Sequence, residues 1–150
     1  MAVKQVYRAD FTMDYPGKDS WRFSAAGASK VCILSPNEYV LIEKVSGGEI
    51  NEDKLLKLLS NYKVDLMLLE GFYQALAHSG RVHKLVVGRG PEEVANMIDG
   101  CSEPLLGCVI TSSTVASKVG LKDVRTYTFS TELDELAKDT MNLIQIHDTR

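Results

Sequence analysis

The 150-residue sequence lacks the features that mark several large classes of protein. No apolar run approaches the ~20 residues that a membrane-spanning helix needs. The first eight residues include Lys4 and Arg8, unlike a secretory signal. No cluster of Lys and Arg is longer than two residues and the net charge is −3, which disfavours nucleic acid as the main partner. We therefore expect a cytoplasmic protein that binds neither membranes nor nucleic acids.

Motifs for nucleophilic or metal chemistry are also scarce. The three cysteines, Cys32, Cys101 and Cys108, have no metal-ligand spacing. Cys32 and Cys108 stand inside apolar runs, which predicts buried thiols in a reducing compartment. The sequence contains no Gly-x-Ser-x-Gly, and its three histidines form no His-x-x-x-His pair. Neither a hydrolase nucleophile nor a zinc site is predicted.

The loop that cradles nucleotide phosphates, Gly-x-x-x-x-Gly-Lys-[Ser/Thr], does not occur in these residues. Gly17-Lys18 comes nearest to it, but no glycine stands five residues before Gly17. Asp19 follows Lys18, and a carboxylate beside the lysine disfavours a triphosphate. We therefore predict that residues 1–150 do not bind GTP tightly by themselves.

Short apolar runs alternate with amphipathic stretches, which predicts an α/β fold with a mostly parallel sheet. The length fits a single domain over residues 1–150. The runs at 30–35 and 64–69 are expected to be buried strands. The expected strands lie at 3–6, 30–35, 39–45, 64–69, 84–87, 105–110 and, as an edge strand, 124–129.

The clearest helix covers 51–62, with Asn51 as its cap. Pro91 begins another, with Gly100 beyond its end. Shorter helices are expected at 20–28, capped by Asp19, and between Ser113-Thr114 and Gly120. The stripe of the first helix consists of Leu55, Leu58, Leu59 and Tyr62. The last helix, from residue 130 or 131, is expected to bury Leu133, Leu136, Ala137, Met141 and Ile144.

Glu70 is the first candidate site residue. It follows an apolar strand and precedes Gly71, so it is expected at the carboxyl end of the strand, where α/β folds bind ligands. A carboxylate there suits Mg²⁺, which is bound through one or two carboxylates and keeps several waters. The alternative is a carboxylate that caps the next turn.

The loop at 10–20 is the second candidate. Asp10 and Asp14 could approach a metal or a polar ligand, and Lys18 and Ser20, beside a helix start, could meet an anion. The alternative is an acidic, solvated loop in which Asp19 only caps the helix.

Three segments together resemble one known family. The first combines Asp10-Phe11 with PGKDSWR at 16–22 and Ala-Gly-Ala at 26–28. The second is the strand at 31–35, which ends in Ser35-Pro36, and the third is DLMLLEGF at 65–72, followed by a similar strand at 84–89. In order and spacing these segments are similar to the molybdopterin-guanine dinucleotide biosynthesis adaptor family (MobB), from about residue 2 to 89.

The resemblance implies a P-loop NTPase-like α/β fold, a mostly parallel sheet flanked by helices, here without the family's first strand, P-loop and first helix. It implies Mg²⁺ and GTP as ligands, with Glu70 as the acid on the magnesium side. Molybdopterin or its guanine dinucleotide is a further candidate ligand. The residues expected to contact ligands are Asp10, Lys18, Asp19, Ser20, Arg22, Glu70 and Gly71.

The implied role is that of an accessory protein in guanylylation of the molybdenum cofactor, without GTPase activity of its own. Its expected partners are the guanylyltransferase or a molybdoenzyme, and a second copy in a homodimer that shares the stretch at 31–45. A competing arrangement moves residues 3–7 into the vacant centre of the sheet. Two other functions stay open: a degenerate, non-catalytic interaction module that pairs with a P-loop-bearing partner, and an enzyme of unrelated chemistry.

Overall fold

A computed structural model describes residues 1–8, 10–45, 48–112 and 124–148. The chain divides into two compact units. We call Val6–Glu49 the hairpin unit, and Met1–Gln5 together with Ile50–Arg150 the sheet unit. The helix expected between Ser113 and Gly120 lies outside the described residues, and the single domain stays a prediction. None of the described helices has the length and apolarity that a bilayer span requires.

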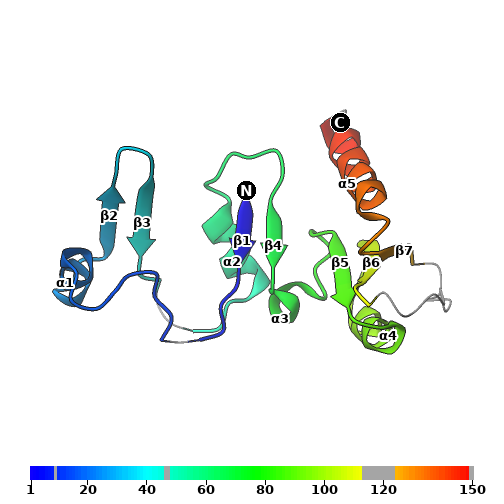
Figure 1. Cartoon of the computed structure of the whole chain (residues 1–150), viewed down its shortest axis with the longest axis horizontal. Coiled ribbons are helices and arrows are strands. Elements are labelled where there is room, and N and C mark those ends of the chain that lie inside the picture. Colours follow the sequence, from blue (N-terminus) through cyan, green and yellow to red (C-terminus); the bar gives the residue numbers. More distant parts are fainter. Residues whose placement is uncertain (9, 46–47, 113–123, 149–150) are drawn as a thin grey trace. The chain divides into compact units, whose positions relative to one another are not determined.

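The sheet unit contains one pair of parallel strands, β1 (Ala2–Lys4) and β4 (Leu68–Glu70) (Figure 1). Two helices accompany the pair, α2 (Glu52–Leu59) and α3 (Tyr73–Leu76). The cap predicted for α2 is confirmed, since the side chain of Asn51 accepts a hydrogen bond from the Lys54 backbone N–H. A core joins these elements, and its buried members are Leu55, Leu59, Phe72 and Leu76.

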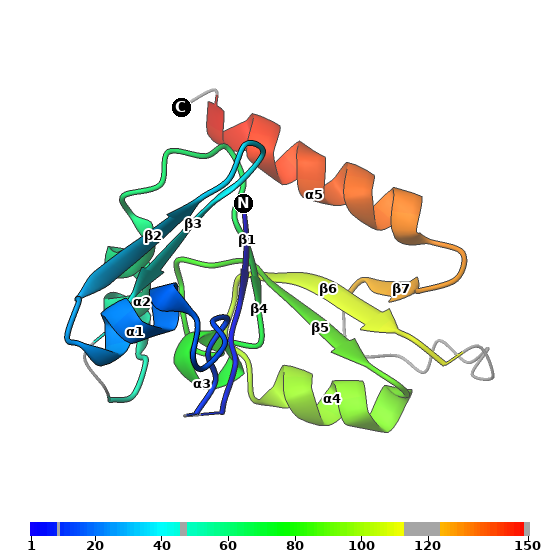
Figure 2. The same ribbon diagram turned by 60° about the vertical axis from the view of Figure 1, so that its left-hand side comes forward.

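A second, three-stranded parallel sheet in the same unit has the order β5 (Lys84–Gly88), β6 (Leu105–Ile110), β7 (Thr126–Thr128). Helix α4 (Pro91–Asp99) lies along β5 and β6 (Figure 2), and α5 (Leu133–Asp148) follows β7. As predicted, α4 begins at Pro91, and Gly100 follows its last residue as the C-cap. The core of this part consists of Val86, Val94, Cys108 and Ile110.

The hairpin unit consists of α1 (Asp19–Ala25) and an antiparallel hairpin, β2 (Lys30–Leu34) with β3 (Tyr39–Glu43). Val31 pairs with Ile42, and Val31 is the buried side chain of the two strands. The turn falls at Pro36-Asn37, as the sequence predicts, so this pair departs from the parallel pattern of the other strands.

Two strands are less buried than the sequence indicated. The run at 64–69 gives a strand only at β4, and Leu68 is 57% exposed. The strand expected at 30–35 forms as β2, but the prediction that it is buried was wrong, because Leu34 is 80% exposed. Cys32 is also exposed, whereas Cys108 is buried as predicted. Within the hairpin unit, β2 pairs with β3 and contacts α1 on the side of Val31, so the other side chains of β2 stay exposed within that unit.

Some helix predictions also need correction. Asp19 does not cap α1: Lys18 is the N-cap residue, and no side chain caps the helix. The short helix α3 forms at residues for which the sequence predicted no helix. Several side chains expected in apolar stripes are exposed: Leu58, Leu133, Ala137 and Met141, together with Tyr62, which lies beyond the end of α2. Leu136 is half-buried, and the side chain of Ile144 is not described.

Candidate functional site

Glu70 is the last residue of β4, as the sequence predicts for a carboxylate at a strand's carboxyl end. The Gln5 N–H donates to its carbonyl oxygen at 2.9 Å. Its carboxylate meets a cation across the strand pair: Lys4 Nζ lies 2.5 Å from Glu70 Oε2. Both side chains are about two-thirds exposed, at 70% and 66%. The candidate acid is therefore held in a solvated ion pair.

Gly71 follows with a backbone φ of +95°, a left-handed conformation that favours glycine. A Cβ at this position would lie 3.3 Å from Cβ of Gln5. The glycine thus lets the chain turn sharply beside β1 directly after Glu70, and this turn fixes the Glu70 backbone at the end of the strand.

The family's magnesium ion can be tested against these residues. No group of three or more His, Cys, Asp or Glu that could hold a metal occurs among the described residues. Glu70 offers one carboxylate, and the ammonium of Lys4 already opposes it. A Mg²⁺ ion at this carboxylate would compete with the Lys4 ammonium, which lies 2.5 Å from Glu70 Oε2. The metal role of Glu70 stays a prediction.

The loop before α1 holds its two candidate carboxylates in different ways. Asp10 pairs with the guanidinium of Arg8 at 2.9 Å, and this hydrogen bond lowers the pKa of Asp10. Asp14 accepts from the Ser20 hydroxyl and from the Tyr15 backbone N–H, each at 2.9 Å. Its other oxygen is buried and finds no hydrogen-bond partner in the described structure. Asp14 and Ser20 therefore tie the loop to the start of α1.

Three charged residues lie at the start of α1. Lys18 is the N-cap residue, and its ammonium makes no hydrogen bond or ion pair with the described residues. Asp19 and Arg22 form an exposed pair with 3.8 Å between Oδ1 and Nη1. The structure thus brings Lys18, Ser20 and Arg22 together at the start of α1, with two exposed cations and a half-buried hydroxyl that donates to Asp14. Such a group can meet a solvated anion, in competition with Asp19.

The predicted site residues fall in both units. Asp10, Lys18, Asp19, Ser20 and Arg22 lie together in the hairpin unit, whereas Glu70 and Gly71 lie in the sheet unit. The sequence also predicts that Glu70 faces a cleft shared with the loop at 10–20, and this stays a prediction.

Sequence reasoning missed two cations, Lys4 and Arg8, which neutralise candidate carboxylates. Arg8 carries a local signal, because it stands two residues from Asp10. Lys4 has no such local signal, because it is 66 residues away from Glu70 in the sequence. The two residues meet only through the register of β1 against β4.

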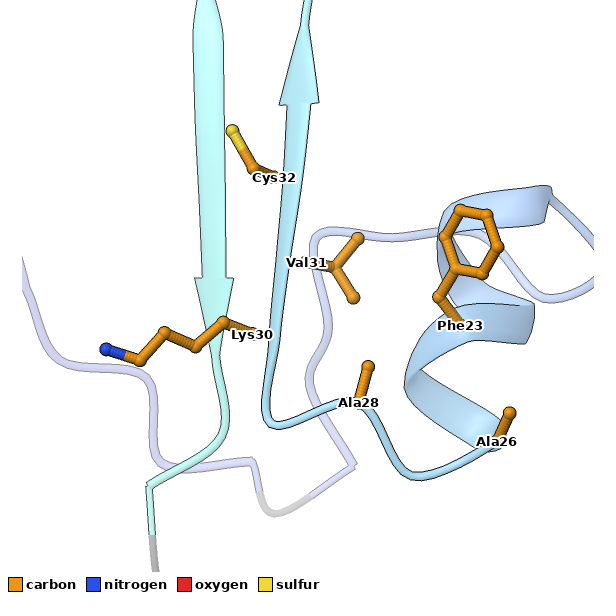
Figure 3. Close-up of a pocket in the computed structure, with 6 residues that line it drawn as sticks. All are labelled: Phe23, Ala26, Ala28, Lys30, Val31 and Cys32. Carbon is orange, nitrogen blue, oxygen red and sulfur yellow. The ribbon is translucent and has the colours of Figure 1, made fainter.

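The hairpin unit also has a hollow of about 420 Å³ between the end of α1 and β2 (Figure 3). In the figure, Val31 points toward α1 and Phe23, while Lys30 and Cys32 project from the other side of β2. Lys30 pairs with Glu43 at 3.0 Å. The side chains that line the hollow toward α1 are apolar: Phe23, Ala26, Ala28 and Val31.

Comparison with known proteins shows that this chain is similar to proteins named for molybdopterin-guanine dinucleotide biosynthesis. The family model "Molybdopterin guanine dinucleotide synthesis protein B" (MobB) matches residues 2–109. The molybdopterin-guanine dinucleotide biosynthesis adapter protein of Escherichia coli (strain K12) is 30% identical over 86 residues, 57% of this chain and 49% of that protein. A putative adapter protein of the same name from Methanocaldococcus jannaschii is 29% identical over 76 residues, 51% of this chain and 31% of that protein. The chain spans half or less of the length of these curated relatives.

A solved structure shows a likeness to the same family. The crystal structure of a molybdopterin-guanine biosynthesis protein B (mobB) matches with a TM-score of 0.60 and 25% identity, over 96% of this chain and 78% of that one. This likeness and the parallel strands flanked by helices confirm the predicted fold class, an α/β fold of the P-loop NTPase-like kind. The family model covers well over half of the sequence, and the chain therefore belongs to the MobB family.

Proposed function

We propose that this chain is an accessory protein in the guanylylation of the molybdenum cofactor, and that it acts by binding rather than by hydrolysing GTP alone. The match of residues 2–109 to the MobB family carries this proposal. Two further observations support the lack of hydrolysis. The sequence of these residues has no phosphate-cradling loop, and Lys4 lies against the carboxylate of Glu70.

The start of α1 is the proposed anion contact. Lys18 and Arg22 supply two exposed cations, while the Ser20 hydroxyl already donates its hydrogen to Asp14. The ligand class that fits is an exposed phosphate, as in molybdopterin or its guanine dinucleotide. Solvated charge pairs contribute about 0.2–1 kcal/mol each, so each cation changes affinity by up to roughly five-fold. Binding of this strength suits a contact that assists a partner's site.

The proposed partners follow from the same role. The guanylyltransferase that attaches GMP to molybdopterin is the first, and a molybdoenzyme that receives the product is the second. A second copy of the chain, in a homodimer, is the third. The site of action proposed is the cytoplasm.

The proposal is tested by calorimetric binding of the chain to purified guanylyltransferase loaded with molybdopterin. A double variant, Lys18→Met with Arg22→Met, removes both cations of α1. Lys57→Met, on the exposed side of α2, is the matched control for charge. We expect the double variant to bind roughly two- to thirty-fold more weakly and the control to bind as the unchanged chain does. Absence of binding by the unchanged chain, or an equal loss in the control, would contradict the proposal.

A further inference from the structure

Trp21 is the single tryptophan of the sequence, and it lies on α1 with 38% of its surface exposed. An indole is a large, flat and mostly apolar group, and a fold that buries it gains more than from most other side chains. Here part of the ring system stays open to water. Trp21 therefore offers an aromatic surface that the described fold does not fully use.

Two cations lie next to Trp21 on the same side of α1. The Arg22 N–H donates to the Lys18 carbonyl at 2.9 Å, so Lys18 stands one helical turn before Arg22. Residues three and four positions apart are neighbours on a helix surface. Lys18 therefore has Trp21 and Arg22 as its neighbours on the next turn. We call these three side chains the indole face.

The rest of the hairpin unit contacts other sides of α1. The Ser20 hydroxyl donates to Asp14 at 2.9 Å, and Phe23 lines the hollow beside Val31 (Figure 3). With 3.6 residues per turn, Trp21 lies roughly 100° around the helix from Ser20 and roughly 160° from Phe23. The indole face therefore points away from both contacts.

The two cations of the indole face are available to an anion. The Lys18 ammonium makes no hydrogen bond or ion pair with the described residues. Arg22 pairs with Asp19 across 3.8 Å, and the side chains are 71% and 87% exposed. So long and solvated a pair contributes little, which allows a stronger anion to replace Asp19. The indole face thus combines a partly open aromatic ring with two cations.

This combination fits a ligand that carries both a planar ring and a phosphate. Heteroaromatic rings stack on aromatic side chains, and lysine and arginine side chains bind phosphate oxygens. A phosphate without a ring would satisfy the cations but leave the indole unused. The contact needs only side chains from one side of α1 and does not rely on the backbone N–H groups at the helix start.

We propose that the indole face binds a phosphorylated pterin or purine, with the planar ring stacked on Trp21 and the phosphate beside Lys18 and Arg22. This inference rests on the proposed function, because it adds a ring contact to the same phosphate contact. Trp21 supplies what the cations alone do not, which is discrimination between a heteroaromatic phosphate and other anions. One stacked ring and two solvated charge pairs give a dissociation constant that is roughly millimolar.

NMR titration of the chain tests this contact, because the single tryptophan gives one indole N–H resonance. The probes with a fused ring are GMP and 6-hydroxymethylpterin phosphate, and the probe without a ring is ribose 5-phosphate. We expect both ring probes to shift the indole resonance upfield, because a stacked ring shields the protons above it. Ribose 5-phosphate should not produce this shift. The ring probe that binds more tightly identifies the ring that the indole face prefers.

Three variants of the chain separate the ring from the phosphate. Trp21→Leu should weaken both ring probes roughly five-fold or more and change the affinity for ribose 5-phosphate by less than about two-fold. Phe23→Leu is the matched control on the same helix, and it should bind all probes as the unchanged chain does. Lys18→Met with Arg22→Met should weaken all three probes. Shifts of the α1 backbone amides measure these affinities.

The proposal is overturned if neither ring probe shifts the indole resonance upfield, or if ribose 5-phosphate gives the same shift. Equal losses in Trp21→Leu and Phe23→Leu would also overturn it. The first two results come from the unchanged chain, so they decide the matter even if Trp21→Leu does not fold. Missing stacking with intact binding to the guanylyltransferase would refute the ring contact alone, whereas stacking without that binding would refute the accessory role alone.

Discussion

Lys4 and Glu70 are paired residues of the parallel strands β1 and β4, and 2.5 Å separates Lys4 Nζ from Glu70 Oε2. The carboxylate that the family resemblance assigns to the magnesium side therefore has a cation as its nearest charged neighbour. Both groups are exposed to water, so the pair contributes little to the stability of the fold, on the order of 0–1 kcal/mol. Its main consequence is for ligand binding at the end of β4.

The first prediction concerns GTP. Calorimetric titration of the chain with GTP and Mg²⁺ should give no dissociation constant of micromolar strength or tighter. The variant Lys4→Met frees Glu70 but adds no phosphate-binding backbone, so it should not create tight binding either. Its free energy of unfolding should change by less than about 1 kcal/mol. A micromolar constant for the unchanged chain would contradict this account of the Glu70 site.

The second prediction concerns the turn after β4. Gly71→Ala places a side chain on a residue with φ of +95° and 3.3 Å from Cβ of Gln5. We expect the free energy of unfolding to fall by about 1–2 kcal/mol. Gly80→Ala is the matched control, since nothing lies within 4 Å of its added Cβ. Urea denaturation measures both variants, and equal effects would show that the left-handed turn does not set the cost.

The third prediction concerns pH. Burial, and then the hydrogen bond from its hydroxyl to Asp139 at 2.6 Å, raise the pKa of Tyr127 to about 12. The folded chain therefore holds this proton more tightly than the unfolded chain, whose tyrosine has a pKa near 10. The resulting stability is complete below pH 10 and is lost as the pH rises toward 12.

Ultraviolet absorbance of phenolate measures this titration. One of the six tyrosines should ionise well after the rest, and Tyr127→Phe should remove the late step. The variant should also lower the free energy of unfolding by about 1–3 kcal/mol, because a buried hydrogen bond to a charged group is lost. In the unchanged chain Arg125 lies 2.7 Å from Asp139, and we expect this ion pair to remain in the variant. A single ionisation step for all tyrosines near pH 10 would be inconsistent with the buried Tyr127.

The sequence predicts some elements well because their signals are local. Asn51 caps α2 through a bond three residues away, and Pro91 suits a helix start by its fixed φ, so both boundaries could be placed from the sequence. Glu70 could be placed at a strand end for a similar reason: it closes an apolar run and precedes a glycine.

Other features depend on contacts distant in sequence. Of the apolar run at 64–69, only Leu68 and Leu69 enter β4, while Met67 packs on the α2 core from outside any strand. Apolar residues satisfy burial in either conformation, so the run alone cannot fix the strand. Cys32 is exposed although it stands in an apolar run. Its burial depends on contacts distant in sequence, which the neighbouring residues do not determine.

The fourth prediction is the homodimer through the hairpin at 31–45. Leu34 and Tyr39 are register partners of β2 and β3 and are 80% and 68% exposed. Exposed apolar strands favour association. Light scattering across a dilution series should give a dimer mass that falls to a monomer mass in the double variant Leu34→Lys with Tyr39→Lys. Leu58→Lys, at a residue 50% exposed on α2, should leave the dimer intact. A monomer mass of the unchanged chain at high concentration, with a cooperative melt, would exclude this dimer.

The role in guanylylation is tested most directly by the rate at which purified guanylyltransferase transfers GMP to molybdopterin, measured with and without the chain. A parallel sample containing only the chain and Mg²⁺-GTP monitors release of GDP. The account predicts a higher transfer rate when the chain is present and no GDP from the chain alone. An unchanged transfer rate, or steady GDP release by the chain alone, would contradict it.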